Sequence, residues 1–276
     1  FLSSAVDRSP SRTMNEMLKV AEILRYRLHF SGYLHLKILP DVSNDYLEEA
    51  VKLATRVSVN LEAPTPQSLC QIAPQKNFFG IWQKFQWFES QKKKGLSAPA
   101  GVTTQLVVGG SKETDREIMH TTSQLYEHFG LARVYYSAFQ PVADTPLSYK
   151  PPVSTWREHR LYQADFLLRR YNFSFEELIF DEEGNFPLSL DPKVLWANHH
   201  PEFFPVEVNS APREVLIRVL GIGTTSARRI INLRRESVFR DPKALSRLGV
   251  RIDKAMPFIL LNGKKIKRAE QLSLFA

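Results

Sequence analysis

The stretch Leu220-Gly221-Ile222-Gly223-Thr224-Thr225-Ser226-Ala227-Arg228-Arg229-Ile230 (residues 220–230) decides the organisation of the C-terminal part of the chain. Its two glycines interrupt a helical pattern and permit a tight loop. Apolar residues recur at helical spacing on both sides of that loop, namely Leu216, Val219 and Leu220 before it and Ala227, Ile230, Ile231 and Leu233 after it. We predict one helix capped by Asn209 or Ser210, a loop at 221–223 whose Ile222 plugs the core, and a second helix over 224–235.

Such a loop can turn consecutive backbone N–H groups outward at a helix N-terminus, which is an arrangement that binds phosphate. Hydroxyl and guanidinium groups follow directly. The candidate DNA-binding residues are Gly221, Ile222, Gly223, Thr224, Thr225, Ser226, Arg228 and Arg229. The pattern resembles the helix-hairpin-helix family, and 242–250 resembles a degenerate second hairpin. We expect salt-sensitive binding to the DNA backbone without base selection. A hairpin that serves only protein packing is the alternative.

The positive charge of the chain lies in its last quarter. The net charge is +8, and residues 206–276 hold 15 Lys/Arg against 6 Asp/Glu, whereas residues 1–205 hold 22 against 23. This asymmetry favours a neutral body joined to a polyanion-binding region over a merely soluble basic domain.

The first 140 residues alternate short apolar runs with helical segments, a pattern typical of an α/β fold with a parallel sheet. We predict strands near 1–6, 33–39, 56–62, 103–109 and 133–139. Ser43 is the expected cap of a helix after the second strand, Thr114 and Glu117 form a capping box, and Gly130 closes that helix. A long helix is expected around 156–171.

Each predicted strand has an apolar face and a polar face. Leu36, Val57 and Leu106 can pack on helices, which leaves His35, Lys37, Ser58, Asn60, Glu62 and Gln105 on the other side. Polar groups in an interior need partners, and a polar ligand at the carboxyl ends of the strands is the simplest one. Gly109-Gly110 would let the backbone approach that ligand. An internal network, or an open sheet whose polar face meets water, is the alternative.

The segments His35-Leu36-Lys37-Ile38, Arg56 to Pro64 and Gln105 to Gly110, with the terminal hairpin, resemble the radical S-adenosylmethionine proteins of DNA modification and repair. The resemblance spans essentially the whole chain. It implies a partial (β/α)6 barrel followed by a small all-α helix-hairpin-helix domain, and a [4Fe–4S] cluster with S-adenosylmethionine. The cofactor-binding residues that it implies are His35, Lys37, Ser58, Asn60, Glu62, Gln105, Gly109, Gly110 and Ser137.

The chain departs from that family at its cluster loop. The family carries a C-x3-C-x2-C motif after the first barrel strand, whereas this chain has only Cys70. Because a cluster needs thiolate ligands, we expect neither cluster nor other metal in this chain. The opening Phe1-Leu2-Ser3-Ser4-Ala5-Val6 reads as the tail of a strand and favours a missing upstream segment over a degenerate relative. Two functions stay open: the C-terminal portion of a radical enzyme acting on DNA, or a non-catalytic DNA- and clamp-binding protein with a structural barrel.

The last residues form a second candidate motif. Gln271, Leu272, Ser273, Leu274 and Phe275 resemble the pentapeptide with which bacterial replication and repair proteins bind the DNA sliding clamp. A short segment with Leu and Phe side chains suits a preformed apolar pocket, although an apolar C-terminus can also dock on its own domain.

The composition bears on membrane insertion and on the cellular compartment. No apolar run reaches the length of a membrane span, and the single cysteine fits a reducing cytoplasm. We divide the chain into a partial barrel at 1–150, a connector at 151–205, a helix-hairpin-helix domain at 206–262 and a basic tail at 263–276.

Overall fold

The computed structural model describes residues 1–266, and it divides the chain into two units. The α/β unit comprises residues 1–165 and 180–188, and the C-terminal unit comprises residues 166–179 and those from 189 onward. The division falls within helix α6 (Thr155–Tyr171).

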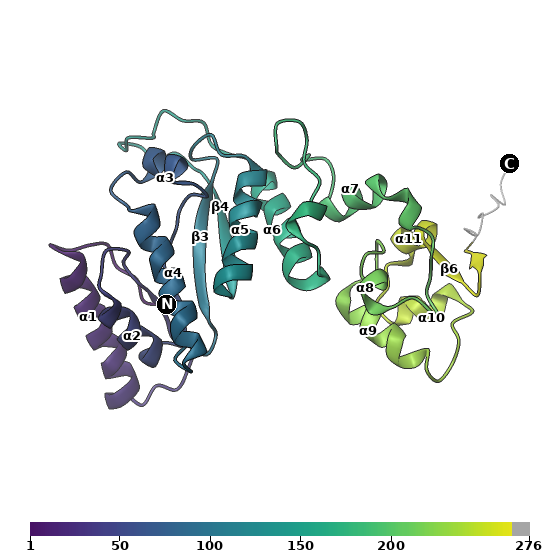
Figure 1. Ribbon diagram of the computed structural model, residues 1–276, viewed down its shortest axis with the longest axis horizontal. Helices are drawn as coiled ribbons and strands as arrows, with labels where there is room; N and C mark the ends of the chain where they lie inside the picture. Colours follow the sequence, from purple (N-terminus) through teal and green to yellow (C-terminus); the bar gives the residue numbers. More distant parts are fainter. Residues whose placement is uncertain (267–276) are drawn as a thin grey trace, which may run out of the picture. The chain divides into compact units, whose positions relative to one another are not determined.

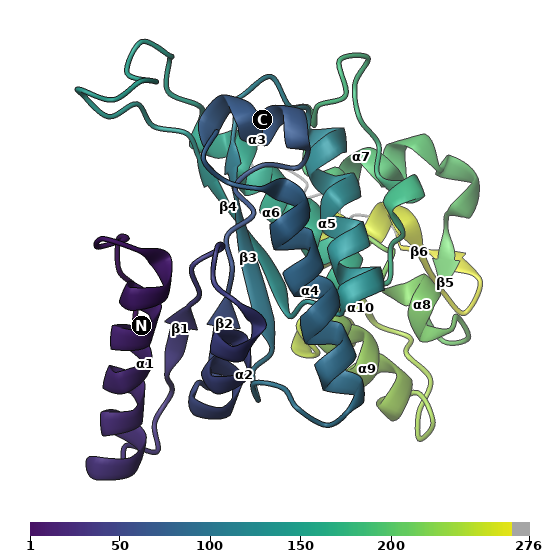
Figure 2. The same ribbon diagram turned by 60° about the vertical axis from the view of Figure 1, so that its left-hand side comes forward.

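The α/β unit is built on a parallel sheet of four strands in the order β1-β2-β3-β4. Figure 1 labels β3 and β4, and Figure 2 labels all four strands. The strands are β1 (His35–Lys37), β2 (Arg56–Ser58), β3 (Val102–Val108) and β4 (Arg133–Ala138). The helices are α1 (Pro10–Glu22), α2 (Asn44–Leu53), α3 (Pro66–Ile72), α4 (Phe78–Lys93) and α5 (Asp115–Phe129), followed by α6. The α/β prediction with a parallel sheet is therefore confirmed.

The predicted split of the strand faces is also confirmed. Leu36, Val57 and Leu106 have no exposed surface, and α4 and α5 lie side by side in front of the sheet (Figure 2). His35, Lys37 and Gln105 on the opposite face are half-buried. One face of the sheet thus holds the core, and the other presents polar side chains.

The helix ends follow the predicted chemistry with one exception. Thr114 and Glu117 form the reciprocal capping box of α5, and Gly130 ends that helix with a left-handed φ of 58°. Ser43 occupies the N-cap position of α2 but its hydroxyl makes no capping bond.

Three strand predictions were too long, and the one at 33–39 corresponds to β1 at His35–Lys37. At 1–6 only Leu2 pairs, through a parallel bridge to Leu36. Strand β2 ends at Ser58 instead of residue 62, because the N–H of Leu61 donates to the Thr104 hydroxyl at 2.9 Å and Glu62 takes a left-handed φ of 68°. The ladder with β3 is interrupted there and resumes only as a bridge between Glu62 and Leu106.

Side chains cover the outer edge of β4. The N–H groups of Val134, Tyr136 and Ala138 donate to the Tyr126 hydroxyl at 2.9 Å, the Tyr162 hydroxyl at 3.0 Å and the Glu158 carboxylate at 2.8 Å. These acceptors come from α5 and α6. The sheet therefore ends at β4 with its edge donors satisfied.

The C-terminal unit contains short helices and a small sheet. The helices are α7 (Pro192–His199), α8 (Arg213–Leu216), α9 (Thr224–Leu233), α10 (Pro242–Arg247) and α11 (Ile252–Ala255), and the strands are β5 (Val206–Glu207), β6 (Ile259–Leu261) and β7 (Lys264–Lys265) in the order β5-β6-β7. The prediction of an all-α domain was wrong, because apolar strand residues at both ends of 206–261 pair and enter the same core.

Candidate nucleic-acid interface

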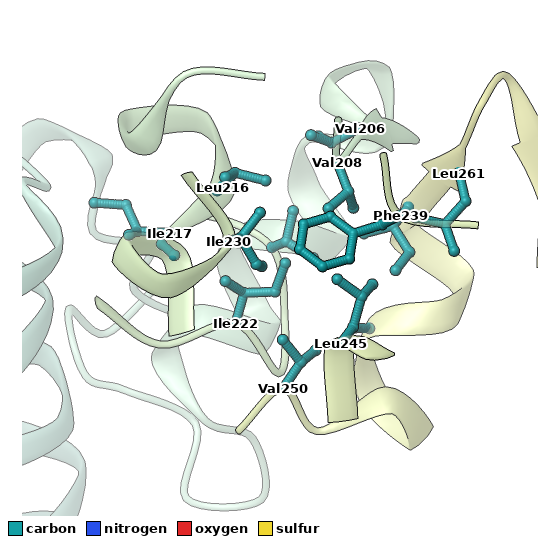
Figure 3. Close-up of a cluster of buried hydrophobic side chains, with 14 residues drawn as sticks. Val206, Val208, Leu216, Ile217, Ile222, Ile230, Phe239, Leu245, Val250 and Leu261 are labelled. Atoms are coloured by element: carbon teal, nitrogen blue, oxygen red, sulfur yellow. The ribbon is translucent and has the colours of Figure 1, made fainter. Parts of the chain in front are cut away.

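The predicted loop joins α8 to α9, and its central residue is buried as expected. Ile222 has a relative exposure of 1 % and lies in a core with Ile230 of α9 and Leu245 of α10 (Figure 3). The side chain of Ile222 therefore anchors the loop from inside, while Gly221 and Gly223 on either side are half-buried.

The first helix is shorter than predicted. Beyond Leu216, the amides of Arg218 and Val219 bond to carbonyls three residues back, at 3.1 and 3.2 Å, so the chain tightens into turns. Neither Asn209 nor Ser210 caps α8; Pro212 holds that position, and the Asn209 side chain instead bonds the backbone of Phe239.

A second helix pair lies against the loop. Helices α10 and α11 flank Gly249, whose φ is 88°, close to the 79° of Gly221. The N–H of Arg251 donates to the Gly221 carbonyl at 2.9 Å, and a Cβ on Gly221 would stand 2.4 Å from the Arg251 carbonyl oxygen. Position 221 therefore requires glycine for two reasons: its backbone is left-handed, and the Arg251 carbonyl leaves no room for a side chain. Helices α10 and α11 thus form a second helix pair that contacts the loop.

Helix α9 begins without a side-chain cap. Gly223 occupies the N-cap position with an extended φ of −93° and has no side chain to accept from the first-turn amides. Thr224 is half-buried and Thr225 exposed, so their hydroxyls lie near that turn, whereas Ser226 is 6 % exposed. The first turn of α9 thus offers N–H donors and the positive end of its dipole.

A pocket of about 350 Å³ opens beside the loop. Its lining residues are Tyr171, Asp191, Lys193, Val194, Leu220, Gly221, Ile222, Gly223, Ser226, Gly249, Arg251 and Lys254. Of these, only residues of the glycine loop and Ser226 belong to the predicted site.

Lys193 is the most constrained cation of this pocket. Its ammonium group donates to the carbonyls of Val219 at 2.8 Å and Ile222 at 3.1 Å, and it lies 4.5 Å from the centre of the Tyr171 ring. Burial lowers the pKa of Lys193 to about 7, with Asp191 opposing and Arg218 adding to the decrease. Lys193 thus ties the glycine loop to α7.

Exposed cations surround the loop. Arg228 and Arg229 extend from α9, and Arg251 and Lys254 come from the second helix pair; all four are exposed. The Arg229 guanidinium donates to the Leu248 carbonyl at 3.2 Å. The sequence motif did not include Lys193, Arg251 and Lys254, because they lie outside residues 220–230. Gly249, at the turn between α10 and α11, could have indicated Arg251 and Lys254.

The residues expected around a cofactor lie along the polar sheet face, and some of them meet. The Asn60 amide and the Gln105 carbonyl oxygen are 3.4 Å apart. Ser58 pairs in register with Lys37, and Ser137 lies near the end of β4. Glu62 instead turns away from the strand and forms an ion pair with Lys76 at 2.6 Å.

The space around Gly109 and Gly110 is filled by the chain itself. A Cβ on Gly109 would lie 2.3 Å from Val153, and one on Gly110 would lie 3.0 Å from Ile72. The Gly109 N–H donates to Glu113, and the Gly110 carbonyl accepts from Lys150 at 2.6 Å. These glycines allow close packing of neighbouring side chains.

The described residues do not fit an iron–sulfur cluster. Cys70, the one cysteine of the sequence, is exposed on α3, and no three His, Cys, Asp or Glu side chains within residues 1–266 gather as metal ligands. Gln271, Leu272, Ser273, Leu274 and Phe275 lie outside the described residues.

Comparisons with protein-family models, curated proteins and solved structures find no match to this chain. Among residues 1–266, none of the helices combines the length and the apolar character needed to cross a membrane.

Proposed function

We propose that this chain binds DNA through its phosphate backbone at the loop between α8 and α9. The observation that carries the proposal is the joining of two features: an uncapped helix N-terminus beside a glycine loop, and four exposed cations from two braced helix pairs. N–H donors and guanidinium groups contact phosphate oxygens without reading base edges.

The second helix pair supports this reading over a hairpin used only for packing. Arg251 and Lys254 line the pocket together with the glycine loop. Arg229 of the first pair donates to the carbonyl of Leu248, the residue before Gly249 of that pocket. A purely structural hairpin needs the buried Ile222 but has no need of four exposed cations around it.

The test is the affinity for a fluorescently labelled duplex, measured by anisotropy at several salt concentrations and on unrelated sequences. We expect affinity to fall linearly on a log–log plot with a slope of roughly −0.9 for each phosphate contacted. The double variant Arg228→Gln/Arg229→Gln should weaken binding equally for all sequences and lower that slope by about two.

The matched control is Lys93→Gln/Lys94→Gln, which removes the same charge at two exposed residues at the end of α4. Its duplex affinity should remain near that of the wild type. Equal losses in the two double variants would reduce the effect to net charge and overturn the proposed site.

A second candidate is the C-terminal portion of a radical S-adenosylmethionine enzyme. It rests on the sequence resemblance and is favoured by the polar face of the parallel sheet, where Asn60 and Gln105 offer amide groups. Calorimetry with S-adenosylmethionine tests it without requiring activity, and Asn60→Ala should abolish any binding seen. Iron and sulfide analysis of the product of the whole gene separates this candidate from the non-catalytic alternative.

That alternative is a DNA- and clamp-binding protein in which the α/β unit is structural. Its partner would be the bacterial sliding clamp, held by Gln271 to Phe275. Pull-down with purified clamp, compared between the wild type and Gln271→Ala/Phe275→Ala, tests it; retention of the double variant would refute it.

A further inference from the structure

Unbonded polar atoms concentrate on one face of the α/β unit. Within residues 1–266, six buried side-chain nitrogen or oxygen atoms have no hydrogen-bond partner. Four of them belong to His35 (Nε2), Arg56 (Nε), Thr103 (Oγ1) and Arg133 (Nε). Because unpaired buried polar groups are costly, a cluster of four in one place points to a missing partner.

Strand register places these four residues on the polar face of the sheet. His35 pairs with Arg56 across β1 and β2, and Thr103 pairs with both Ser58 of β2 and Arg133 of β4. Directly paired residues share a face, and so do residues two apart such as Arg56 and Ser58. Lys37, the register partner of Ser58, joins the same face.

The two arginines converge on one tyrosine. An Arg56 terminal nitrogen lies 3.4 Å from the Tyr135 hydroxyl, and the Arg133 guanidinium lies 4.8 Å from the centre of the Tyr135 ring. Thr103, on the intervening strand, is 1 % exposed. The Arg133 guanidinium also lies 5.5 Å from the centre of the Tyr162 ring. Tyr135 is thus a contact that Arg56 and Arg133 share.

These cations lack anionic partners. In the part of the chain that the structure describes, no carboxylate forms an ion pair with Lys37, Arg56 or Arg133. Two other half-buried arginines have carboxylate partners: Arg157 pairs with Asp115 at 2.7 Å, and Arg218 pairs with Glu177. Arg25 and Arg234 instead donate to backbone carbonyls. Arg56 and Arg133 differ from these arginines because each keeps a buried Nε without a partner, and such N–H donors suit an external anion.

We propose that this face binds a small phosphate ester, with the phosphate held between Arg56 and Arg133 and near Lys37. Two guanidinium forks match the geometry of a tetrahedral dianion and bind it bidentately. The partner is a soluble mononucleotide or a similar phosphomonoester, because the cations span only four neighbouring short strands. This site is independent of the DNA-binding loop.

His35 provides a local reporter. Burial and the adjacent Arg56 lower the pKa of His35 to about 4, so its ring is neutral at pH 7. A bound dianion would offset both effects in part, and the pKa of His35 should rise on binding.

The experiment titrates the full chain with adenosine monophosphate, with inorganic phosphate and with adenosine. Calorimetry measures affinity, and the His35 ring proton, assigned with His35→Gln, reports the location by NMR. We expect both phosphates to bind and adenosine not to bind. Arg56→Gln and Arg133→Gln should each weaken binding roughly 10- to 100-fold, and the Lys variants at these positions should retain part of the affinity. Arg12→Gln, at an exposed arginine of α1, is the control.

Circular dichroism verifies that each variant is folded. If a Gln variant is unfolded, the affinity of the Lys variant at the same position provides the test. Equal binding of adenosine and its monophosphate, absence of phosphate binding at millimolar concentration, or unchanged affinity in both folded arginine variants would each overturn the site. Duplex affinity should be unaffected by Arg56→Gln; its loss would show that DNA phosphates occupy this face instead of a small ligand.

Discussion

In the loop between α8 and α9, Gly221→Ala and Gly223→Ala should differ in their cost in stability, although both add the same methyl group. In Gly221→Ala the new Cβ must adopt a left-handed φ of 79° and would lie 2.4 Å from the Arg251 carbonyl oxygen. The left-handed conformation costs about 1–2 kcal/mol and the overlap about 1–3 kcal/mol, so we expect a loss of roughly 2–5 kcal/mol. In Gly223→Ala, φ is −93° and the nearest atom, the Tyr171 hydroxyl, is 3.6 Å away. Its cost should be about 1 kcal/mol or less, that of alanine at an N-cap.

Amide hydrogen exchange in α9 is the appropriate assay, because it reports local opening of this segment in a chain of two units. Protection of Ile230 should fall steeply in Gly221→Ala and little in Gly223→Ala. Duplex affinity provides the second readout: at a temperature where both are folded, the Gly223 variant should bind roughly tenfold more weakly, because its methyl group occupies the surface beside the first-turn amides. Equal exchange in the two variants would refute the packing argument, and unchanged affinity of Gly223→Ala would refute the DNA-binding assignment.

Three further changes test other parts of the structure. Since the pKa of Lys193 in the folded protein, about 7, lies below its ordinary value of 10.5, the unfolded chain binds the extra proton between these values and stability should rise with pH across that window. Lys193→Met should abolish this rise in urea unfolding at pH 6.5 and 9, and a persisting difference in stability between the two pH values would contradict this cause. Asp115 is fully buried and forms an ion pair with Arg157. Asp115→Ala should lower the free energy of unfolding by about 3–5 kcal/mol in denaturant unfolding, because the guanidinium group of Arg157 would be left without its carboxylate partner. A loss below about 1 kcal/mol would show that the pair is dispensable. Thr114→Ala removes half of the capping box of α5 and should lower stability by about 1 kcal/mol in the same assay, whereas Ser43→Ala, whose hydroxyl makes no capping bond, should change it little; equal losses would contradict the assignment of the caps.

Local patterns predicted four strands of the α/β unit and the helices α2, α5 and α6, but they predicted neither α1, α3 and α4 nor where the strands stop. Alternation placed Leu36, Val57 and Leu106 on the core face, and Gly130 ended α5, because both features depend on near neighbours in the sequence. The end of β2 depends on the Thr104 hydroxyl of another strand. No pattern within 56–62 contains that information.

The residues of the candidate interface were likewise predicted only in part. The glycine loop and Ile222 follow from a contiguous motif, whereas Lys193 reaches the loop from 26 residues before Val219. The basic sheet face was overlooked because Arg56 and Arg133 are single cations in separate strands. Only strand pairing brings them to the same tyrosine.

The covered edge of β4 bears on self-association through strand pairing. A bare outer strand would be a template on which a second molecule could add its own strand, which is how many proteins begin to aggregate. Here two tyrosine hydroxyls and one carboxylate occupy the donors that such a strand would use. The side chains of Tyr126, Glu158 and Tyr162 therefore block the addition of a further strand at this edge.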